Sequence, residues 1–340
     1  MGNHLMSYTA SYRLGQKQQY QSKEGLAMVK PEVSAVDIDL KTGNTLGFYA
    51  LGTDRPNVLI LSAMDGTSAT DVYASYLVMK HLEGLERIDG SVTLLPVANP
   101  LSFRLGTRVS PLDSLDLDTV FPGNEQGTVT QRTAWEIWRR VSQADFVVHL
   151  RTGWQSCISH VVALHRDYIH VRNMASQIAL PLLVQGPGNR GSLITEAAHD
   201  GIAAIAIETR GERGQVEPQA AVEVREAILN FLRIKDMIPG EKMETSSVIA
   251  GRMQHVNVET EGFFVPVVHP GEAVRRGDVI GQVQDRTDVI SPHDGTVVSL
   301  SKMSYVFEGD IIARVATPIA DQWNEDEARE DRTPARRRKW

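Results

Sequence analysis

The chain has 340 residues, of which 42% are hydrophobic, and a formal net charge of −7. At this length we expect two domains, and the hydrophobic content is enough for a large buried core. The mildly acidic balance argues against a nucleic-acid-binding protein, and no apolar run reaches the ~20 residues that span a bilayer. A single cysteine, Cys157, excludes an intramolecular disulfide framework and favours a cytoplasmic protein.

The first 44 residues are expected to form an N-terminal extension that ends in the first strands. Between residues 45 and 240, apolar runs rich in Val, Ile and Leu alternate with stretches that carry apolar residues at helical spacing. Several runs are apolar along their whole length, which indicates strands buried on both faces of a mostly parallel or mixed sheet. The predicted strands are 46–51, 57–64, 91–100, 145–153, 159–165 and 203–211, and the predicted helices are 69–85, 130–144 and 218–234.

The pattern of apolar residues changes after residue 240. Short alternating runs separated by Gly and Pro predict a small all-β module over residues 241–318. The segments GDVIGQV (277–283) and GDIIARV (309–315) form a faint internal repeat within it. Residues 319–340 contain an acidic run followed by RRRK and are expected to be a solvated, mobile tail.

Two loops are candidates for the walls of a ligand pocket. SAMDGTSATD, residues 62–71, joins a buried strand to a helix, at the strand end where open α/β folds place their ligands. It contains Asp65 and Asp71 but no histidine or cysteine. The second loop, QGPGNRGS (185–192), lacks the spacing and the lysine of a phosphate-binding loop, and we expect it to lie over the pocket.

A series of short motifs follows in a fixed order along the α/β region. They are Asn99-Pro100, Arg108, Asp116-Leu117, Phe121-Pro122-Gly123, the run 145–153, and the strand that ends at Glu208. Over about residues 45–317 this series resembles the succinylglutamate desuccinylase/aspartoacylase family of zinc carboxypeptidase-like hydrolases. The resemblance implies a three-layer α/β/α domain with a mixed sheet, followed by a small C-terminal barrel-like all-β module.

The chemistry that this resemblance implies is metal-assisted amide hydrolysis of N-acyl amino acids. A zinc ion held by three side chains polarises the acyl carbonyl, a glutamate moves the proton, and arginines bind the substrate carboxylate. On this chain the resemblance assigns the catalytic glutamate to Glu208 and substrate contacts to Arg108, Asn99 and Asp116.

The zinc ligands implied by the resemblance are all replaced here. They fall on Asp65, Ser68 and Arg151, and a guanidinium has no lone pair to give to a metal. In the segment that resembles the family's DLNR motif, the asparagine has become Asp118 and the arginine Thr119. We therefore expect neither zinc nor another cofactor.

The pocket at the strand ends can be pictured in two ways. His149 and Arg151 are two residues apart on a strand and should face the same pocket. A rebuilt metal site could use Asp65, His149, Asp116 and Glu208, although Arg151 among them would repel a divalent cation. Alternatively, Arg151 neutralises the carboxylates, since buried unpaired charge is costly. Of its two possible partners, Asp65 and Glu208, we expect it to pair with Asp65 at the former metal position.

Three functions remain open from the sequence. The first is a non-catalytic relative of the deacylases that acts by binding, as a partner of an active paralogue or within an oligomer. The second is a working amidohydrolase or deacylase, in which Glu208 is the acid/base. The third is a protein that binds a small carboxylate ligand through Arg108.

Overall fold

The structure is a computed structural model that describes residues 28–153, 156–211, 214–284 and 286–319. The expected N-terminal extension up to residue 27 and the charged tail from residue 320 lie outside the described residues. Within the described residues, no helix is both long enough and apolar enough to cross a bilayer.

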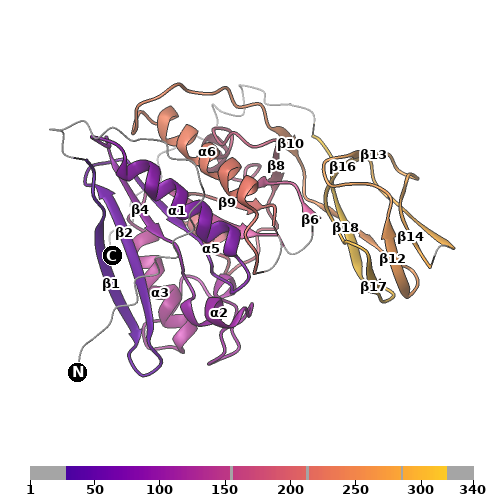
Figure 1. Ribbon diagram of the computed structural model, residues 1–340, viewed down its shortest axis with the longest axis horizontal. Coiled ribbons are helices and arrows are strands. Elements are labelled where there is room, and N and C mark those ends of the chain that lie inside the picture. The colour runs from indigo at the N-terminus through magenta and orange to yellow at the C-terminus, as the bar shows by residue number, and fades with distance from the viewer. Residues whose placement is uncertain (1–27, 154–155, 212–213, 285, 320–340) are drawn as a thin grey trace, which may run out of the picture.

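A nine-stranded mixed sheet forms the centre of the larger domain (Figure 1). Its first two strand pairs are antiparallel, as is β7–β9, and the other pairs are parallel. In spatial order the strands are β1 (Glu32–Asp39), β2 (Asn44–Gly52), β4 (Ser91–Leu95), β3 (Asn57–Leu61), β5 (Phe146–Thr152), β9 (Ala203–Thr209), β7 (His160–Ala163), β8 (Leu182–Gln185) and β10 (Val248–Ala250). The sheet therefore takes in β1 and β10, which lie outside the predicted range 45–240.

Helices cover both faces of this sheet because its strands bury side chains on both sides. Val58 and Ile60 of β3 pack into one core, and Leu59 and Leu61 pack into the other. The first core is completed by α1 (Ala69–Glu83), α4 (Ile169–Ala175) and α6 (Pro218–Ile234), and the second by α3 (Val129–Val141) and α5 (Leu193–His199). Two shorter elements follow β4, namely α2 (Pro100–Leu105) and the 3₁₀ helix η1 (Leu117–Thr119). This is the three-layer arrangement expected from the sequence.

The helix ends follow from the local sequence. Thr128 and Gln131 form a capping box at the start of α3, and Pro218 occupies the first turn of α6, where its missing N–H costs nothing. Asn99 caps α2 by accepting a hydrogen bond from the Ser102 amide.

The C-terminal module consists of two antiparallel sheets around one shared core (Figure 1). One sheet has the order β11-β18-β16-β13 and the other β15-β14-β12-β17. The strands are β11 (Gln254–Asn257), β12 (Gly262–Pro266), β13 (Ala273–Val274), β14 (Val279–Val283), β15 (Thr287–Ile290), β16 (Gly295–Leu300), β17 (Ser304–Val306) and β18 (Ile311–Ala316).

The sequence repeat in this module corresponds to two equivalent turns, one before β14 and one before β18. In each, the aspartate after the glycine accepts a hydrogen bond from the amide three residues earlier: Asp278 from Arg275 at 2.7 Å and Asp310 from Phe307 at 2.8 Å. The preceding glycines, Gly277 and Gly309, have φ values of 96° and 87°, which only glycine adopts readily.

The module is joined to the larger domain by pairing and by packing. The two-residue strand β6 (Ser156–Cys157), which follows β5, pairs with β16. A small apolar cluster lies at the same junction and contains Leu182, Val184, Ala250, Val298 and Ala316. Side chains of the module are thereby held beside the carboxyl ends of the main strands.

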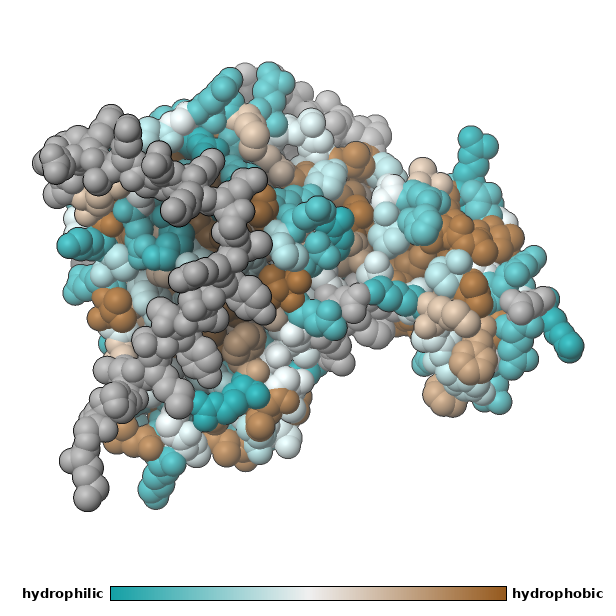
Figure 2. All heavy atoms as spheres, in the orientation of Figure 1, coloured by the Kyte–Doolittle hydropathy of each residue, from teal (hydrophilic) through white to brown (hydrophobic). Residues whose placement is uncertain are grey.

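Hydrophobic residues also lie on the surface of the module, as Figure 2 shows. Three aromatic side chains on β12 and the β17 edge form a ladder of edge-to-face contacts: Phe263, Tyr305 and Phe307. Their exposed fractions are 57%, 48% and 61%.

Candidate functional site

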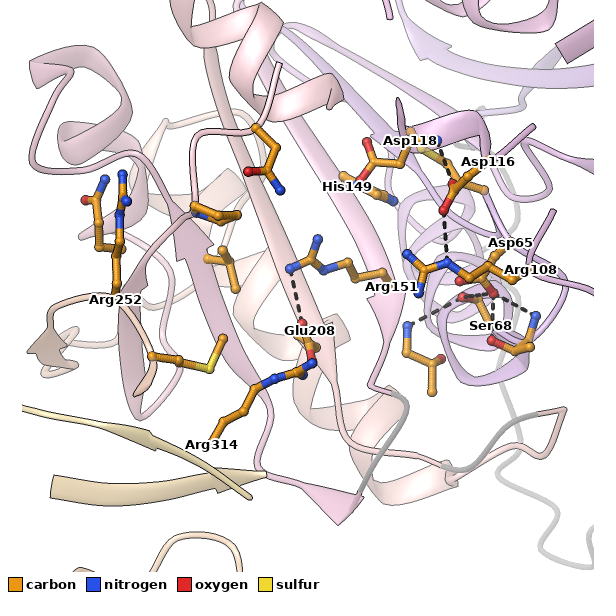
Figure 3. A pocket seen from close by; sticks show the side chains of 18 of the residues that line it. Asp65, Ser68, Arg108, Asp116, Asp118, His149, Arg151, Glu208, Arg252 and Arg314 are labelled. Carbon is orange, nitrogen blue, oxygen red and sulfur yellow. Dashed lines mark hydrogen bonds and ion pairs between the residues drawn. The ribbon is translucent and has the colours of Figure 1, made fainter. Parts of the chain in front are cut away.

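A pocket of about 520 Å³ lies at the carboxyl ends of β3, β5 and β9 (Figure 3). These strands are parallel neighbours, so the residues that follow them meet at one edge of the sheet. The lining residues from the larger domain include Met64, Asp65, Thr67, Ser68, Arg108, Asp116, Asp118, His149, Arg151, Thr152 and Glu208.

The loop after β3 is held in a fixed shape by its own backbone. Ala63, a non-glycine residue, has a φ of 50°, a left-handed conformation that is uncommon outside glycine. Its carbonyl accepts a hydrogen bond from the Asn99 amide at 2.9 Å, and the Gly66 amide donates to the Thr107 carbonyl at 2.7 Å. The connection after α2 therefore fixes the loop that carries Asp65.

Asp65 is held by hydrogen bonds within its own loop, and it forms no ion pair with an arginine among the described residues. Its Oδ1 accepts hydrogen bonds from the Thr67 amide and the Thr67 hydroxyl, both at 2.7 Å, and from the Ser68 hydroxyl at 3.3 Å. Ser68 Oγ in turn accepts a bond from the Thr152 amide at 3.5 Å, which ties the loop to β5. The expectation that Arg151 pairs with Asp65 is therefore wrong.

Arg151 pairs instead with Glu208. Its Nη2 lies 3.1 Å from Glu208 Oε2, and the two residues face each other across the β5–β9 ladder (Figure 3). Registered neighbours on parallel strands need no loop movement to meet, whereas Asp65 belongs to a loop that already satisfies its Oδ1. Arg151 therefore pairs with the carboxylate that lies beside it on the sheet.

Glu208 remains ionised although it is buried. Burial alone would raise the pKa of its carboxyl, but the positive charge of Arg151, with smaller effects from His160 and Arg314, lowers that pKa below its ordinary value. Arg314 comes from β18, so the C-terminal module contributes a charge to this site (Figure 3). A carboxylate held this way is a poor proton acceptor, because its charged form is the stabilised one.

Arg108 and Asp116 form a second ion pair on the opposite side of the pocket. Arg108 Nε lies 2.9 Å from Asp116 Oδ2, and the other oxygen of Asp116 caps η1 through the Asp118 amide at 3.0 Å. Asp118 accepts a hydrogen bond from the Leu193 amide at 2.9 Å. Burial raises the pKa of the Asp118 carboxyl to about 6, and Arg151 partly opposes this rise.

His149 is a neutral ring that faces the pocket. It is 2% exposed, lines the pocket, and makes no hydrogen bond with any described residue. Burial, and secondarily the charge of Arg151, lowers the pKa of the imidazole to about 3. The ring therefore offers a ligand one N–H donor and one nitrogen acceptor, without a charge, at any pH near neutrality.

Two residues that the sequence singled out lie outside the lining. Asn99, expected to contact substrate, uses its side chain to cap α2 and to donate to the Met64 carbonyl at 3.2 Å, so it supports the loop. Asp71 is fully buried behind the loop and accepts a hydrogen bond from the Thr152 hydroxyl at 2.9 Å. Burial raises the pKa of the Asp71 carboxyl to about 7, although the nearby hydroxyls of Thr209, Thr152 and Ser68 oppose the rise.

A profile of the succinylglutamate desuccinylase/aspartoacylase catalytic domain matches residues 54–235, more than half of the chain. The chain belongs to this family. It is 24% identical over 286 residues to the N-alpha-acetyl-L-2,4-diaminobutyric acid deacetylase of Halomonas elongata. The matched region covers 78% of this chain and 83% of the relative.

Solved structures of the succinylglutamate desuccinylase/aspartoacylase family share the fold. A protein of this kind from Rhodobacter sphaeroides has a TM-score of 0.73 at 20% identity, over 86% of this chain and 95% of its own. The product-bound ectoine utilization protein EutE (DoeB) of Ruegeria pomeroyi has a TM-score of 0.72 at 21% identity, over 84% and 93% of the two chains. The zinc carboxypeptidase-like fold with a C-terminal β module is therefore shared across nearly the full length.

The family's zinc does not fit the residues present here. The positions that the resemblance assigns to its ligands are Asp65, Ser68 and Arg151, and the last is engaged with Glu208 at 3.1 Å. Across the described parts of the chain, no three His, Cys, Asp or Glu side chains are grouped so that they could hold a metal ion. Arg151 also places a fixed positive charge in the pocket, which repels a divalent cation.

Sequence reasoning missed the wall of the pocket that the C-terminal segment supplies. Arg252, Met253 and His255 follow β10 and begin β11, and they line the pocket together with Arg314. Gln185, Pro187 and Asn189 of the 185–192 loop complete this wall, in agreement with the placement of that loop over the pocket. Nothing in the local sequence of 252–255 marked it as part of a site, because it lies far along the chain from the other lining residues.

Proposed function

We propose that this member of the family binds a small amino-acid-type carboxylate ligand in its pocket and does not carry out zinc-dependent hydrolysis. The observation that carries the proposal is the ion pair between Arg151 and Glu208 at 3.1 Å. Hydrolysis of the family's type requires a cation that accepts electron density from an acyl oxygen and a glutamate free to accept a proton. Here a guanidinium neutralises that glutamate.

The pocket itself supports binding. A volume of about 520 Å³ lies in the range that small-molecule sites occupy. Arg108 lines the pocket and uses its Nε on Asp116, so its terminal N–H groups are left to donate to a ligand carboxylate. Ligand selection by such a site rests on charge and hydrogen bonding and needs no metal.

Metal analysis and an activity assay on the full chain test the proposal together. Protein purified without chelators is expected to contain far less than one zinc per chain by inductively coupled plasma mass spectrometry. Incubation with Nα-acetyl-L-2,4-diaminobutyrate, the compound named for the Halomonas relative, should release no acetate above the buffer control. Stoichiometric zinc, or acetate release abolished by a chelator, would refute the proposal.

The alternative is an active deacylase that works without metal. The feature that favours it is the retained pocket with Glu208 at the strand end assigned to the catalytic glutamate. It predicts acetate release that is insensitive to chelators and is lost in Glu208→Gln. The same assay therefore separates the two functions.

A further inference from the structure

The strand β17 (Ser304–Val306) is an open edge of the C-terminal module. It is the last strand of the sheet β15-β14-β12-β17, and among the described residues only β12 pairs with it. The junction with the larger domain uses β16 and β18, which belong to the other sheet of the module. The free edge of β17 is therefore left clear of the larger domain (Figure 1).

Tyr305 carries the unpaired backbone groups of this edge. The Gln284 amide donates to the Phe263 carbonyl at 2.9 Å, so the backbone groups of Phe263 are directed toward the β14 side of β12. Hydrogen-bonded and non-hydrogen-bonded positions alternate along an antiparallel pair, so Phe263 and its cross-strand partner Tyr305 form a non-hydrogen-bonded pair. The N–H and C=O of Tyr305 therefore point away from β12, and neither makes a hydrogen bond with a described residue.

Exposed hydrophobic side chains flank these backbone groups on the outer face of the sheet. Phe263, Tyr305 and Phe307 form the aromatic ladder, and Met303 is 67% exposed. Met303, Tyr305 and Phe307 are spaced by two residues, so strand alternation places them on one face. An edge that combines free backbone groups with a hydrophobic face is a template for pairing with another chain.

We propose that two copies of this chain associate by antiparallel pairing of their β17 edges. The pairing is centred on Tyr305, whose N–H and C=O bond the C=O and N–H of Tyr305 in the second copy across a two-fold axis. The two sheets then become one continuous sheet, and the two aromatic ladders meet on its outer face.

The sequence on either side of Tyr305 is self-complementary in this register. Lys302 lies three residues before Tyr305 and Glu308 three residues after it, and both are exposed. Each end of the pairing therefore brings a lysine of one copy to a glutamate of the other. Met303 and Phe307 are likewise equidistant from Tyr305, so a thioether meets an aromatic ring on each side of the axis.

The edge strand β1 of the main sheet has the opposite charge pattern. It begins at Glu32 and ends at Asp39, so antiparallel pairing of two β1 strands would place acidic side chains opposite each other at both ends. Like charges directly opposite each other destabilise a strand pair. Charge therefore opposes self-pairing at β1 and favours it at β17, which is why we assign the second copy to the β17 edge.

Sedimentation velocity on the full chain, from about 2 to about 200 µM, tests the association. We expect a monomer–dimer equilibrium with a Kd on the order of 10 µM, because the paired edge is short and the interface is small. Tyr305→Lys should abolish it, since two like charges would then face each other at the axis. Circular dichroism confirms that each variant is folded.

Charge exchange tests the register. Lys302→Glu should weaken self-association about tenfold, because glutamates then meet at both ends, and Glu308→Lys should weaken it similarly through paired lysines. An equimolar mixture of the two single variants should restore the dimer, since each end again joins a glutamate to a lysine. Arg286→Glu makes the same charge change at the other edge of this sheet, beside β15, and should have no effect.

A chain that remains monomeric at about 200 µM, or a dimer that neither single charge variant weakens, would overturn this inference. Failure of the mixed variants to associate would also contradict it, because the lysine and the glutamate would then not meet across the axis. The paired edge does not line the pocket, so these results are independent of the proposed binding function. Zinc content and acetate release test that function separately.

Discussion

Arg151 Nη2 lies 3.1 Å from Glu208 Oε2, and the two residues are registered partners on adjacent parallel strands. The Arg151 side chain is 30% exposed and the Glu208 side chain 9% exposed, so the glutamate is largely buried while the arginine is partly open to the pocket that both residues line. The net contribution of a largely buried ion pair to stability is smaller than the cost of removing one partner, because the remaining charge is then buried without compensation.

Arg151→Gln should lower the free energy of unfolding by about 2–3 kcal/mol, since the charge of Glu208 is then stabilised only by the smaller effects of His160 and Arg314. The double variant with Glu208→Gln should recover most of that loss. Urea unfolding at pH 7 measures both. Lys242→Gln, which removes an exposed pair with Asp236, serves as the control and should change stability by less than about 0.5 kcal/mol. Equal stability of the Arg151 variant and the parent protein would contradict the prediction.

Grafting the family's ligands should create a zinc site. Asp65→His, Ser68→Glu and Arg151→His together should bind about one zinc per chain, because the scaffold places all three positions around one pocket. The double variant that keeps Arg151 is the matched control and should bind none, since the guanidinium repels the cation. Competition with a fluorescent zinc chelator measures the affinity. A triple variant that stays metal-free would mean that these positions do not converge.

Asp71→Asn should stabilise the protein relative to the parent, and this stabilisation should increase as the pH rises. The pKa of Asp71 is raised from 3.8 to about 7 in the folded state, so the folded protein binds the proton more tightly than the unfolded chain. Its contribution to stability is therefore lost between about pH 4 and pH 7, by roughly 2–4 kcal/mol. The side-chain amide introduced by Asp71→Asn does not titrate, so its contribution to stability does not change over this pH range. Unfolding free energies measured from pH 5 to pH 8.5 should show the gain of the variant growing up to about pH 7 and levelling off above it; a difference that is constant over the whole range would refute the assignment.

Gly66→Ala should disrupt the loop that carries Asp65. A Cβ at this position would lie 1.9 Å from the Ser102 carbonyl oxygen, so the loop or α2 must move. We expect a loss of about 2–4 kcal/mol in urea unfolding, together with weaker ligand binding. Gly47→Ala is the matched control, because its Cβ would meet nothing closer than 3.9 Å. If both variants unfold like the parent protein, the packing of this loop is looser than described.

The sequence by itself determined the larger domain, because strands buried on both faces need continuous apolar runs and helices on a sheet need an apolar stripe. The strand in the run 57–64 and the helix at 218–234 can be predicted from the sequence for this reason. Strand alternation also placed His149 and Arg151 in one pocket, and both line it. The break near residue 240 was visible as a loss of helical spacing, although β10 still joins the main sheet.

Only the tertiary structure decided which charges meet. Local sequence could not choose between Asp65 and Glu208 as the partner of Arg151, because that choice depends on the register of β5 with β9 and on the hydrogen bonds that already hold Asp65. Nor could it bring Arg252 and Arg314 to the pocket, since their position depends on how the C-terminal module docks through β6 and β16. Secondary structure follows from short-range patterns, whereas the pairing of charges depends on contacts between residues far apart in the chain.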